Sequence, residues 1–241
     1  MNKIQQKKIV KVNELLLNRF GQPPRNKNLP DPVEMLVATI LSQNTNDRNS
    51  YQAYKNLKEK YPSWEEMAAA KRASIEKEIR IAGLGLQKSA AIKNFLTELK
   101  VKQGVYSLDF IKKVSHDDAI REMTSFKGVG VKTASCVLLF ALGENICPVD
   151  THVHRTVNRL GIVNGSAPDK TFWALNDGFP EKIAHSFHTN LIRLGREICT
   201  PKNPGCGSCP LEKLCVFEGK DVSNKKELKE RAFMLLDSID S

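Results

Sequence analysis

The chain has 241 residues, with 37 Lys and Arg against 27 Asp and Glu, a formal net charge of +10 and a pI of about 9.3. This length suffices for one large domain or two small ones, each with a hydrophobic core. No apolar run reaches the length of a membrane-spanning helix. The basic balance favours a nucleic-acid partner, because Lys and Arg that neutralise phosphates release counterions. A basic protein without such a partner is the alternative, and charge alone does not decide between them.

Helical periodicity dominates from the start of the chain. The first segment carries apolar residues at three- and four-residue steps, as one face of a helix does: Ile9, Val12, Leu16 and Phe20. After a polar loop, Asp31 is placed to cap a second helix with Pro32 at its first position. That helix is expected to bury four residues: Met35, Leu36, Thr39 and Ile40.

The remaining chain continues the helical pattern, and strand signals are scarce. Glycine or proline marks most of the joints between helices. The short connections predict helices that pack as neighbours. Further helices are expected over 47–60, 64–70, 72–81, 87–102, 117–125, 131–142, 151–160, 168–177 and 181–198. The pattern therefore predicts an all-α fold.

Four cysteines near the end of the chain have the spacing C-x6-C-x2-C-x5-C: Cys199, Cys206, Cys209 and Cys215. Four thiolates are the ligand set of an iron–sulfur cluster or of structural zinc. The spacing favours the cluster, because zinc ribbons usually show two separated C-x2-C pairs and this chain has one pair flanked by lone cysteines. Disulfides are a third interpretation, but they belong to oxidising compartments. The charged N-terminal segment lacks an apolar signal core, so we expect a cytoplasmic or otherwise intracellular protein.

A second motif joins two of the expected helices. In Gly128-Val129-Gly130, two glycines flank a valine that is suited to fix the turn to the core. Glycines leave backbone N–H groups uncovered, and a helix N-terminus attracts phosphate. A tight turn between helices is the alternative interpretation. Lys132 follows in the first helical turn, off the apolar face, where a surface lysine is the default. No G-x-x-x-x-G-K-[ST] motif occurs, which argues against a nucleotide hydrolase.

A third motif is Pro-Val-Asp-Thr-His-Val-His-Arg over 148–155. Asp150 is placed to cap the following helix, and a carboxylate there is able both to cap and to act chemically. His152 and His154 lie two residues apart and cannot face the same way on a helix. Each suits a structural hydrogen bond better than a metal. Arg155 is a candidate for phosphate contact.

Taken in order, Gly-Val-Gly-x-Lys-Thr-Ala, Val-Asp-Thr-His-Val-x-Arg and the four cysteines resemble the endonuclease III family over about residues 31 to 216. These proteins are helix–hairpin–helix DNA glycosylases with a [4Fe-4S] cluster. The resemblance implies that Lys132 is the nucleophile, that Asp150 assists it, and that the four cysteines bind the cluster. Cys136 and Cys147 have no counterpart in the cluster motif and are expected to be buried thiols.

The resemblance also implies DNA contacts. The segments 41–47 and 83–88 are similar to family loops that fill the gap left by a flipped base. Leu84 is the expected wedge, and Gln43 or Asn44 the polar filler. The first loop departs from the commonest bacterial pattern, which has Ala-Gln-Ala-Thr-Asp after Leu-Ser, so filler and substrate preference stay open. For both loops a helix-end turn is the alternative. The remaining expected DNA contacts are Gly128, Val129, Gly130 and His152.

The implied fold has two helical domains with a C-terminal cluster loop. Residues 31–145 are expected to form a domain carrying the helix–hairpin–helix at about 117–142. Residues 1–30 with 146–216 are expected to form the cluster domain, with the active site between the two. Residues 217–241 are a charged tail, for which the sequence leaves open an added helix, with Leu228, Ala232 and Leu235 on one face, or partial disorder.

The implied function is a bifunctional DNA glycosylase and AP lyase of base excision repair. It removes oxidised pyrimidines through a Schiff base on Lys132 and cuts the strand by β-elimination. The implied partner is damaged double-stranded DNA, bound by a monomer without a membrane. A mismatch- or uracil-directed glycosylase of the same superfamily is one alternative, although monofunctional relatives generally lack the lysine. A non-enzymatic DNA-binding iron–sulfur protein is another, but it has no need of Lys132 with Asp150. A ferredoxin-like carrier does not fit so long a basic chain.

Overall fold

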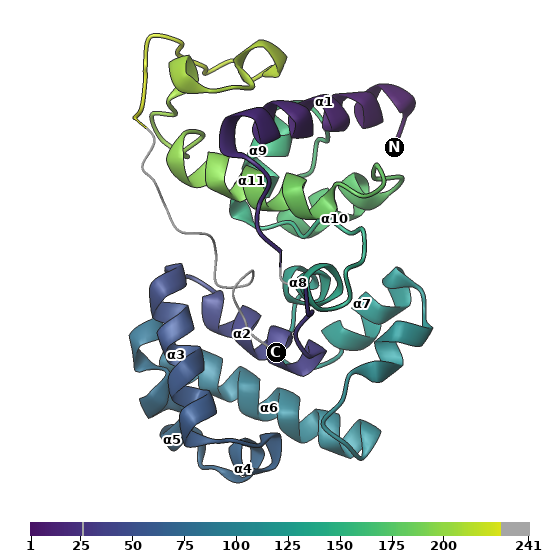
Figure 1. Ribbon diagram of the computed structural model, residues 1–241, viewed down its shortest axis with the longest axis vertical. Coiled ribbons are helices and arrows are strands. Elements are labelled where there is room, and N and C mark those ends of the chain that lie inside the picture. The colour runs from purple at the N-terminus through teal and green to yellow at the C-terminus, as the bar shows by residue number, and fades with distance from the viewer. Residues whose placement is uncertain (26, 228–241) are drawn as a thin grey trace. The chain divides into compact units, whose positions relative to one another are not determined.

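The computed structural model describes residues 1–25 and 27–227 of the chain (Figure 1). Within these residues the secondary structure is helical and no strand occurs, which confirms the all-α prediction. None of the described helices is both long and apolar enough to cross a membrane. The described residues divide into two compact units, 25–143 and 1–24 with 144–227, and each is considered by itself.

The unit of residues 25–143 surrounds one central helix. Helix α2 (Pro32–Ser42) is buried except at Glu34 and Ser42, and it packs on α3, α6 and α8. A helix that is apolar on all sides belongs in a core. The unit also contains α3 (Asp47–Lys60), α4 (Trp64–Ala69), α5 (Arg72–Glu78), η1 (Arg80–Ala82), α6 (Gly85–Gln103), η2 (Asp109–Lys113), α7 (His116–Thr124) and α8 (Val131–Ala141).

The predicted start of α2 is confirmed at atomic detail. The Asp31 carboxylate accepts hydrogen bonds from the backbone N–H groups of Val33 (2.8 Å) and Glu34 (3.3 Å), with Pro32 in the first turn. These bonds satisfy donors that the helix itself leaves without partners. The four residues expected to be buried on this helix are all buried.

The other unit has α11 (Ala184–Glu197) at its centre, packed against both α1 (Lys3–Phe20) and α9 (Thr151–Arg159), and Figure 1 shows α1 and α11 side by side. Helix α10 (Pro168–Asn176) covers α9. Two short turns, η3 (Cys206–Ser208) and η4 (Glu212–Leu214), follow within the cysteine segment. The predicted apolar face of α1 is buried in this unit: Ile9, Val12, Leu16 and Phe20.

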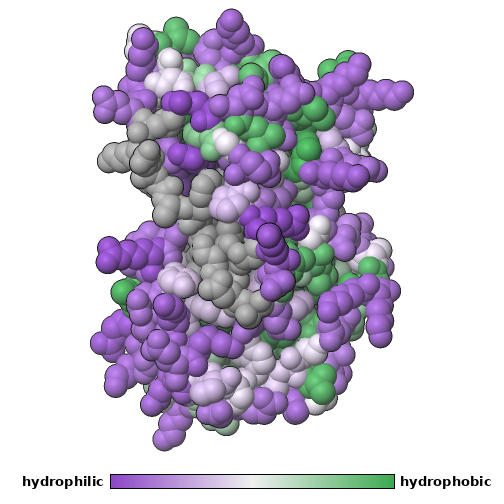
Figure 2. All heavy atoms as spheres, viewed as in Figure 1, coloured by the Kyte–Doolittle hydropathy of each residue, from purple (hydrophilic) through white to green (hydrophobic). Residues whose placement is uncertain are grey.

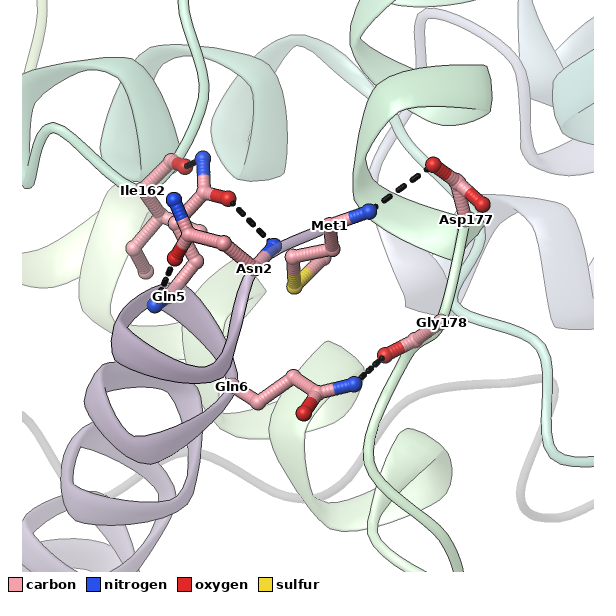
Figure 3. Close-up of polar contacts among 7 residues, drawn as sticks. All are labelled: Met1, Asn2, Gln5, Gln6, Ile162, Asp177 and Gly178. Atoms are coloured by element: carbon pink, nitrogen blue, oxygen red, sulfur yellow. Dashed lines mark hydrogen bonds and ion pairs between the residues drawn. The ribbon is translucent and has the colours of Figure 1, made fainter.

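Side-chain amides fix the first turn of α1 to the unit (Figure 3). The side chain of Asn2 accepts from the backbone of Gln5, and that of Gln5 accepts from the backbone of Asn2, which forms a capping box. The Gln5 amide also donates to the carbonyl of Ile162 (2.9 Å), and the Gln6 amide donates to that of Gly178 (2.8 Å). The helix is therefore attached at its start as well as along its apolar face.

Most helix ends lie within one or two residues of their predicted positions, and two predictions need correction. The single helix expected over 72–81 is divided into α5 and η1, because Ile79 between them leaves helical geometry at φ −98° and ψ 6°. The helix expected from 181 begins only at Ala184, because Lys182 adopts a left-handed conformation with φ 63°. Neither residue type announces such a break.

Candidate functional site

In the turn between α7 and α8, the backbone passes close to helix α6. Gly128 has φ +94°, and a Cβ there would lie 2.8 Å from the Cβ of Ala91 on α6. Glycine is therefore required at this position for conformation and for space. Val129 is buried with 5% of its surface exposed, and Gly130, whose added Cβ would meet nothing within 4 Å, is the N-cap of α8. No side chain caps this helix, so its first N–H groups are available to an anion.

Lys132 lies in the first turn of α8, half-buried, directly behind the glycine turn. Its neighbour Thr133 is buried, and the Thr133 hydroxyl accepts a hydrogen bond of 3.4 Å from the side-chain amide of Gln43. This contact places the loop after α2 beside the lysine-bearing turn. Two segments ninety residues apart in the chain thus meet within one unit.

In the loop after α2, the two candidate polar residues, Gln43 and Asn44, differ in conformation and exposure. Gln43 is half-buried and directed toward Thr133, whereas Asn44 is exposed and left-handed, with φ 48°. Asn46 then caps α3 by accepting from the backbone N–H of Asn49 at 2.9 Å. The loop is therefore held at both ends, and Asn44 is an exposed, left-handed residue between them.

The second loop presents apolar side chains to solvent. Leu84 caps α6 in a left-handed conformation with φ 50°, and its side chain is 45% exposed. Ile81 and Leu86 on either side are 47% and 59% exposed. Such a conformation costs a branched residue about 1–2 kcal/mol, so it persists only where neighbouring contacts impose it. Some DNA-binding proteins insert apolar side chains between base steps, and this turn exposes side chains of that type.

Lys88 lies beneath these loops, and sequence reasoning assigned it no role. Its side chain is buried, with 2% exposure, and its Nζ donates to the carbonyls of Leu41 (2.7 Å) and Ala82 (2.8 Å). Burial lowers the pKa of Lys88 from 10.5 to about 8. A signal for this lysine exists in the sequence, because it occupies the apolar face that continues through Ile92 and Leu96.

In the other unit, Asp150 is the N-cap of α9, as predicted. Its Oδ1 accepts from the backbone N–H groups of His152 and Val153, both at 2.8 Å. Because both bonds go to one oxygen, Oδ2 takes no part in the cap. A single carboxylate is therefore able to hold the helix and to face a second group.

The two histidines of this motif point to different partners, as their spacing requires. His152 lies against Arg155, with its Nδ1 3.2 Å from a guanidinium nitrogen, and burial lowers its pKa. The Nδ1 of His154 lies 2.8 Å from the hydroxyl of Thr171. Arg155 itself donates to the carbonyls of Cys199 and Gly195, each at 2.8 Å. The Arg155 guanidinium thus donates hydrogen bonds to carbonyls within the protein and also contacts His152.

The four predicted ligand cysteines line one cavity. Cys199, Cys206, Cys209 and Cys215 are all half-buried thiols without disulfide bonds, and they line the same small pocket. Within the described residues, no three His, Cys, Asp or Glu side chains converge closely enough to hold a single metal ion. Thiols that surround a space rather than a point suit a cluster of several atoms, whose iron atoms each take one thiolate. The residues present therefore fit the cluster.

Electrostatics at this cavity also call for a cation. Burial, and after it the neighbouring Cys199, Cys215 and Cys206, raise the pKa of the Cys209 thiol to about 12. Four thiolates are unfavourable together in a buried place unless positive charge lies among them. Metal within the cavity would reverse that balance.

Arg159 organises the cavity wall. Its guanidinium donates to the carbonyls of Thr200 (2.9 Å) and Pro201 (3.0 Å) and to the sulfur of Cys199 (3.4 Å). The same group lies over the ring of Phe217 at 4.2 Å, a cation–π contact. One arginine from α9 therefore holds the cysteine segment at both its beginning and its end. The sequence gives no sign of this role, because the contacts join residues 40 or more positions apart and two of them are to backbone carbonyls.

The described part of the charged tail, 217–227, lies against the cysteine segment. The Asn224 side chain donates to the carbonyl of Pro204 (2.9 Å), and the backbone carbonyl of Asn224 accepts from the backbone N–H of Gly207 (2.9 Å). Lys226 donates to the hydroxyl of Thr200 at 2.7 Å. The helix considered for 228–235 lies outside the described residues.

Comparison with known proteins identifies the family of the chain. Residues 37–181 match the family model of HhH-GPD superfamily base excision DNA repair proteins. The chain is 36% identical over 220 residues to the endonuclease III of Thermotoga maritima, covering 90% of this chain and 99% of that protein. It is 39% identical over 169 residues to a protein of Arabidopsis thaliana named as a DNA glycosylase, of which it spans 57%.

A solved structure shows the same fold. The structure of a trapped endonuclease III–DNA covalent intermediate superposes with a TM-score of 0.71 at 27% identity, over 88% of this chain and 95% of that one. The predicted helix–hairpin–helix glycosylase fold is thereby confirmed. With the glycine turn, the lysine behind it and the four cysteines in place, the chain belongs to the endonuclease III family of the HhH-GPD superfamily of base excision DNA repair proteins.

Proposed function

We propose that this base excision repair glycosylase is bifunctional: it removes oxidised pyrimidines from duplex DNA and then cleaves the strand as an AP lyase. The observation that carries the proposal is Lys132 in the uncapped first turn of α8, behind the Gly128–Gly130 turn. An amine at an anion-binding helix start is placed to reach a sugar whose flanking phosphate the turn holds. The similar solved protein is a covalent intermediate with DNA, which supports a nucleophilic route.

The chemistry begins when the target nucleotide leaves the base stack, because the sugar carbon C1′ is otherwise out of reach. The neutral amine of Lys132 forms a bond to C1′, the bond from C1′ to the base breaks, and the base departs with a proton. Opening of the sugar ring gives a Schiff base between Lys132 and C1′. Loss of a proton from C2′ then expels the 3′ oxygen with its phosphate. The strand is cut on the 3′ side of the lesion.

Asp150 supplies the carboxylate in this scheme. Its Oδ1 is engaged by two backbone N–H groups, which fix the side chain, and Oδ2 is outside that cap. A fixed carboxylate is able to accept a proton and to stabilise positive charge that develops on the sugar. A charged carboxylate also favours the ammonium form of an amine, so its benefit lies in these later roles rather than in neutralising Lys132.

The two loops of the 25–143 unit fill the space that the base leaves. Leu84 is the wedge, because it is exposed on a left-handed turn between two other exposed apolar side chains. Gln43 is the polar filler in preference to Asn44, because its amide lies beside the α8 turn while Asn44 faces solvent. The glycine turn contributes backbone contacts to phosphate, with Val129 as its anchor in the core.

The cysteine segment would hold a [4Fe-4S] cluster through Cys199, Cys206, Cys209 and Cys215. When bound, the cluster supplies structural cross-linking of an irregular segment that has little apolar surface of its own to bury. Hydrogen bonds to its backbone carbonyls also hold this segment in place, from Arg159 to Thr200 and from Asn224 to Pro204. The catalytic steps are assigned to Lys132 and Asp150.

The test uses duplexes that carry thymine glycol, uracil, a G·T mismatch or an abasic site, with wild-type protein and Lys132→Gln. Wild-type protein is expected to nick the thymine glycol and abasic duplexes and to become covalently attached to them when borohydride reduces the Schiff base. Lys132→Gln is expected to bind the same duplexes and to lose all covalent trapping, because no amine is left to form the adduct.

Each alternative has a distinct result in this experiment. Excision of uracil or mismatched thymine without oxidised-base excision indicates the mismatch-directed enzyme. Binding without nicking indicates the non-enzymatic module. A covalent adduct that survives in Lys132→Gln would sink the assignment of the nucleophile. Sedimentation of the protein with and without duplex tests the expected monomer.

A further inference from the structure

The Nζ of Lys88 is a single buried group that touches the ends of two loops. It donates to the carbonyl of Leu41, two residues before Gln43, and to that of Ala82, two residues before Leu84. The two distances are 2.7 and 2.8 Å, and the side chain is 2% exposed. The backbone N–H of Lys88 also donates to the carbonyl of Leu84 at 3.0 Å.

Both carbonyls lie at helix ends and lack a hydrogen-bond donor within their own helix. Leu41 stands at the C-terminal end of α2 and Ala82 at the end of η1, where helices leave carbonyls without internal partners. A cation at a helix C-terminus also favours the local dipole. One ammonium thus satisfies two helix ends that are 41 residues apart in sequence.

Both loops beyond these ends contain strained backbone. Asn44 and Leu84, with φ 48° and φ 50°, are two of the non-glycine residues with positive φ in the described chain. Such conformations persist only when the surrounding structure imposes them. The anchoring hydrogen bonds of Lys88 lie within three residues of each strained position, so they belong to the structure that imposes it.

We propose that Lys88 is a positioning residue that couples the two gap-filling loops, so that Gln43 and Leu84 meet DNA as one preformed unit. The inference rests on the proposed function, because the loops need a fixed spacing only if both enter the gap left by a flipped base. Preformed geometry saves the cost of ordering two loops during flipping. Without the ammonium, each loop would move by itself, and the two carbonyls would lack their buried donor.

The chain offers a matched control on the same helix. Lys93 also donates its Nζ to two carbonyls, those of Ala68 (2.8 Å) and Ala70 (2.5 Å), at the end of α4. Lys88→Met and Lys93→Met therefore remove the same kind of double cap. Only the first cap joins the gap-filling loops.

The first measurement is hydrogen exchange of the amides in 42–46 and 83–87, which needs no DNA. We expect Lys88→Met to accelerate exchange in both segments by about tenfold or more, and Lys93→Met to leave both unchanged. If Lys88→Met does not fold, Lys88→Arg, which keeps the charge with a different donor geometry, is measured instead and is expected to loosen both segments by less. Unchanged exchange in either segment would overturn the coupling.

The second measurement compares two reactions of the same variants. Lys88→Met is expected to slow excision of thymine glycol from duplex by about tenfold or more, while cleavage of an abasic site in single-stranded DNA stays within about twofold of wild type. A single strand has no gap to fill, so loss of the coupling between the loops leaves its cleavage unchanged. A general defect of the structure would instead reduce both reactions. Equal losses in both reactions, or an equal loss in Lys93→Met, would overturn the proposal. Wild-type protein that cleaves neither substrate would refute the proposed function instead, and the exchange measurement would still decide the coupling.

Discussion

Two lysines of the same unit show how environment assigns a role. Lys132 is half-buried at the start of α8, with its side chain near a turn that is open to an anion. Lys88 is enclosed and donates to two carbonyls. The first is suited to meet a substrate from outside, and the second to hold the protein together from inside. Their side chains are chemically identical, so burial and partners account for the difference.

The buried charge of Lys88 makes stability depend on pH in a defined window. Its pKa is about 8 in the folded chain, against 10.5 ordinarily, so between these values the unfolded chain binds more protons. The free energy of unfolding contributed by Lys88 is therefore constant below about pH 8 and rises as pH increases to 10.5. We therefore compare the free energy of unfolding of the wild-type protein with that of Lys88→Met. The difference between the two is expected to increase by at most about 3 kcal/mol across this window.

Urea denaturation of both proteins at several pH values checks this expectation. Groups unaffected by the substitution cancel in the difference between the two proteins, which isolates Lys88. A difference that stays flat or falls between pH 8 and 10.5 would contradict the buried-ammonium description.

At the scale of elements, the two glycines of the turn between α7 and α8 have different roles. Gly128 faces inward, where φ +94° and the Cβ of Ala91 exclude a side chain. Gly130 has ordinary φ −99°, and its added Cβ would meet nothing within 4 Å. The first glycine is thus required by the fold, and the second leaves the backbone open to a ligand.

Alanine substitutions separate these two roles. Gly128→Ala is expected to lower the free energy of unfolding by about 1–2 kcal/mol or more, from backbone strain and the clash with Ala91. Gly130→Ala is expected to cost less than about 1 kcal/mol in stability yet to weaken binding of an abasic-analogue duplex, because its methyl group would stand between backbone and phosphate. Chemical denaturation and DNA titration of both variants test this. Equal stability losses would contradict the division.

At the scale of the whole molecule, the described residues form two units, and one of them combines elements from distant parts of the chain. One is continuous, 25–143, and the other joins 1–24 to 144–227. The nucleophile candidate belongs to the first unit, and Asp150 and the cysteines to the second. Hydrophilic side chains cover most of the face in Figure 2, in keeping with the formal charge of +10. The domains predicted as 31–145 and 1–30 with 146–216 remain a prediction, as does their division of labour.

Metal content tests the cluster at this scale. We expect about four iron and four sulfide per chain, and loss of both in Cys206→Ser, because a [4Fe-4S] cluster would take one thiolate for each iron and four cysteines line this pocket. Cys136→Ser, a buried thiol of the other unit, is the control and is expected to keep the metal. One zinc per chain without sulfide would contradict the cluster.

The sequence by itself determined the helices, the family and the candidate chemistry. Apolar periodicity located α2 and its cap at Asp31, and short motifs indicated Lys132, Asp150 and the cysteines, because each depends on residues close together in the chain. Only the tertiary structure separated Gln43 from Asn44, through the contact with Thr133, and revealed Lys88 and Arg159. The Lys88 and Arg159 side chains bond to backbone carbonyls that every residue possesses, so no residue type signals the partner. Which carbonyl lies within reach is decided when distant helix ends pack together.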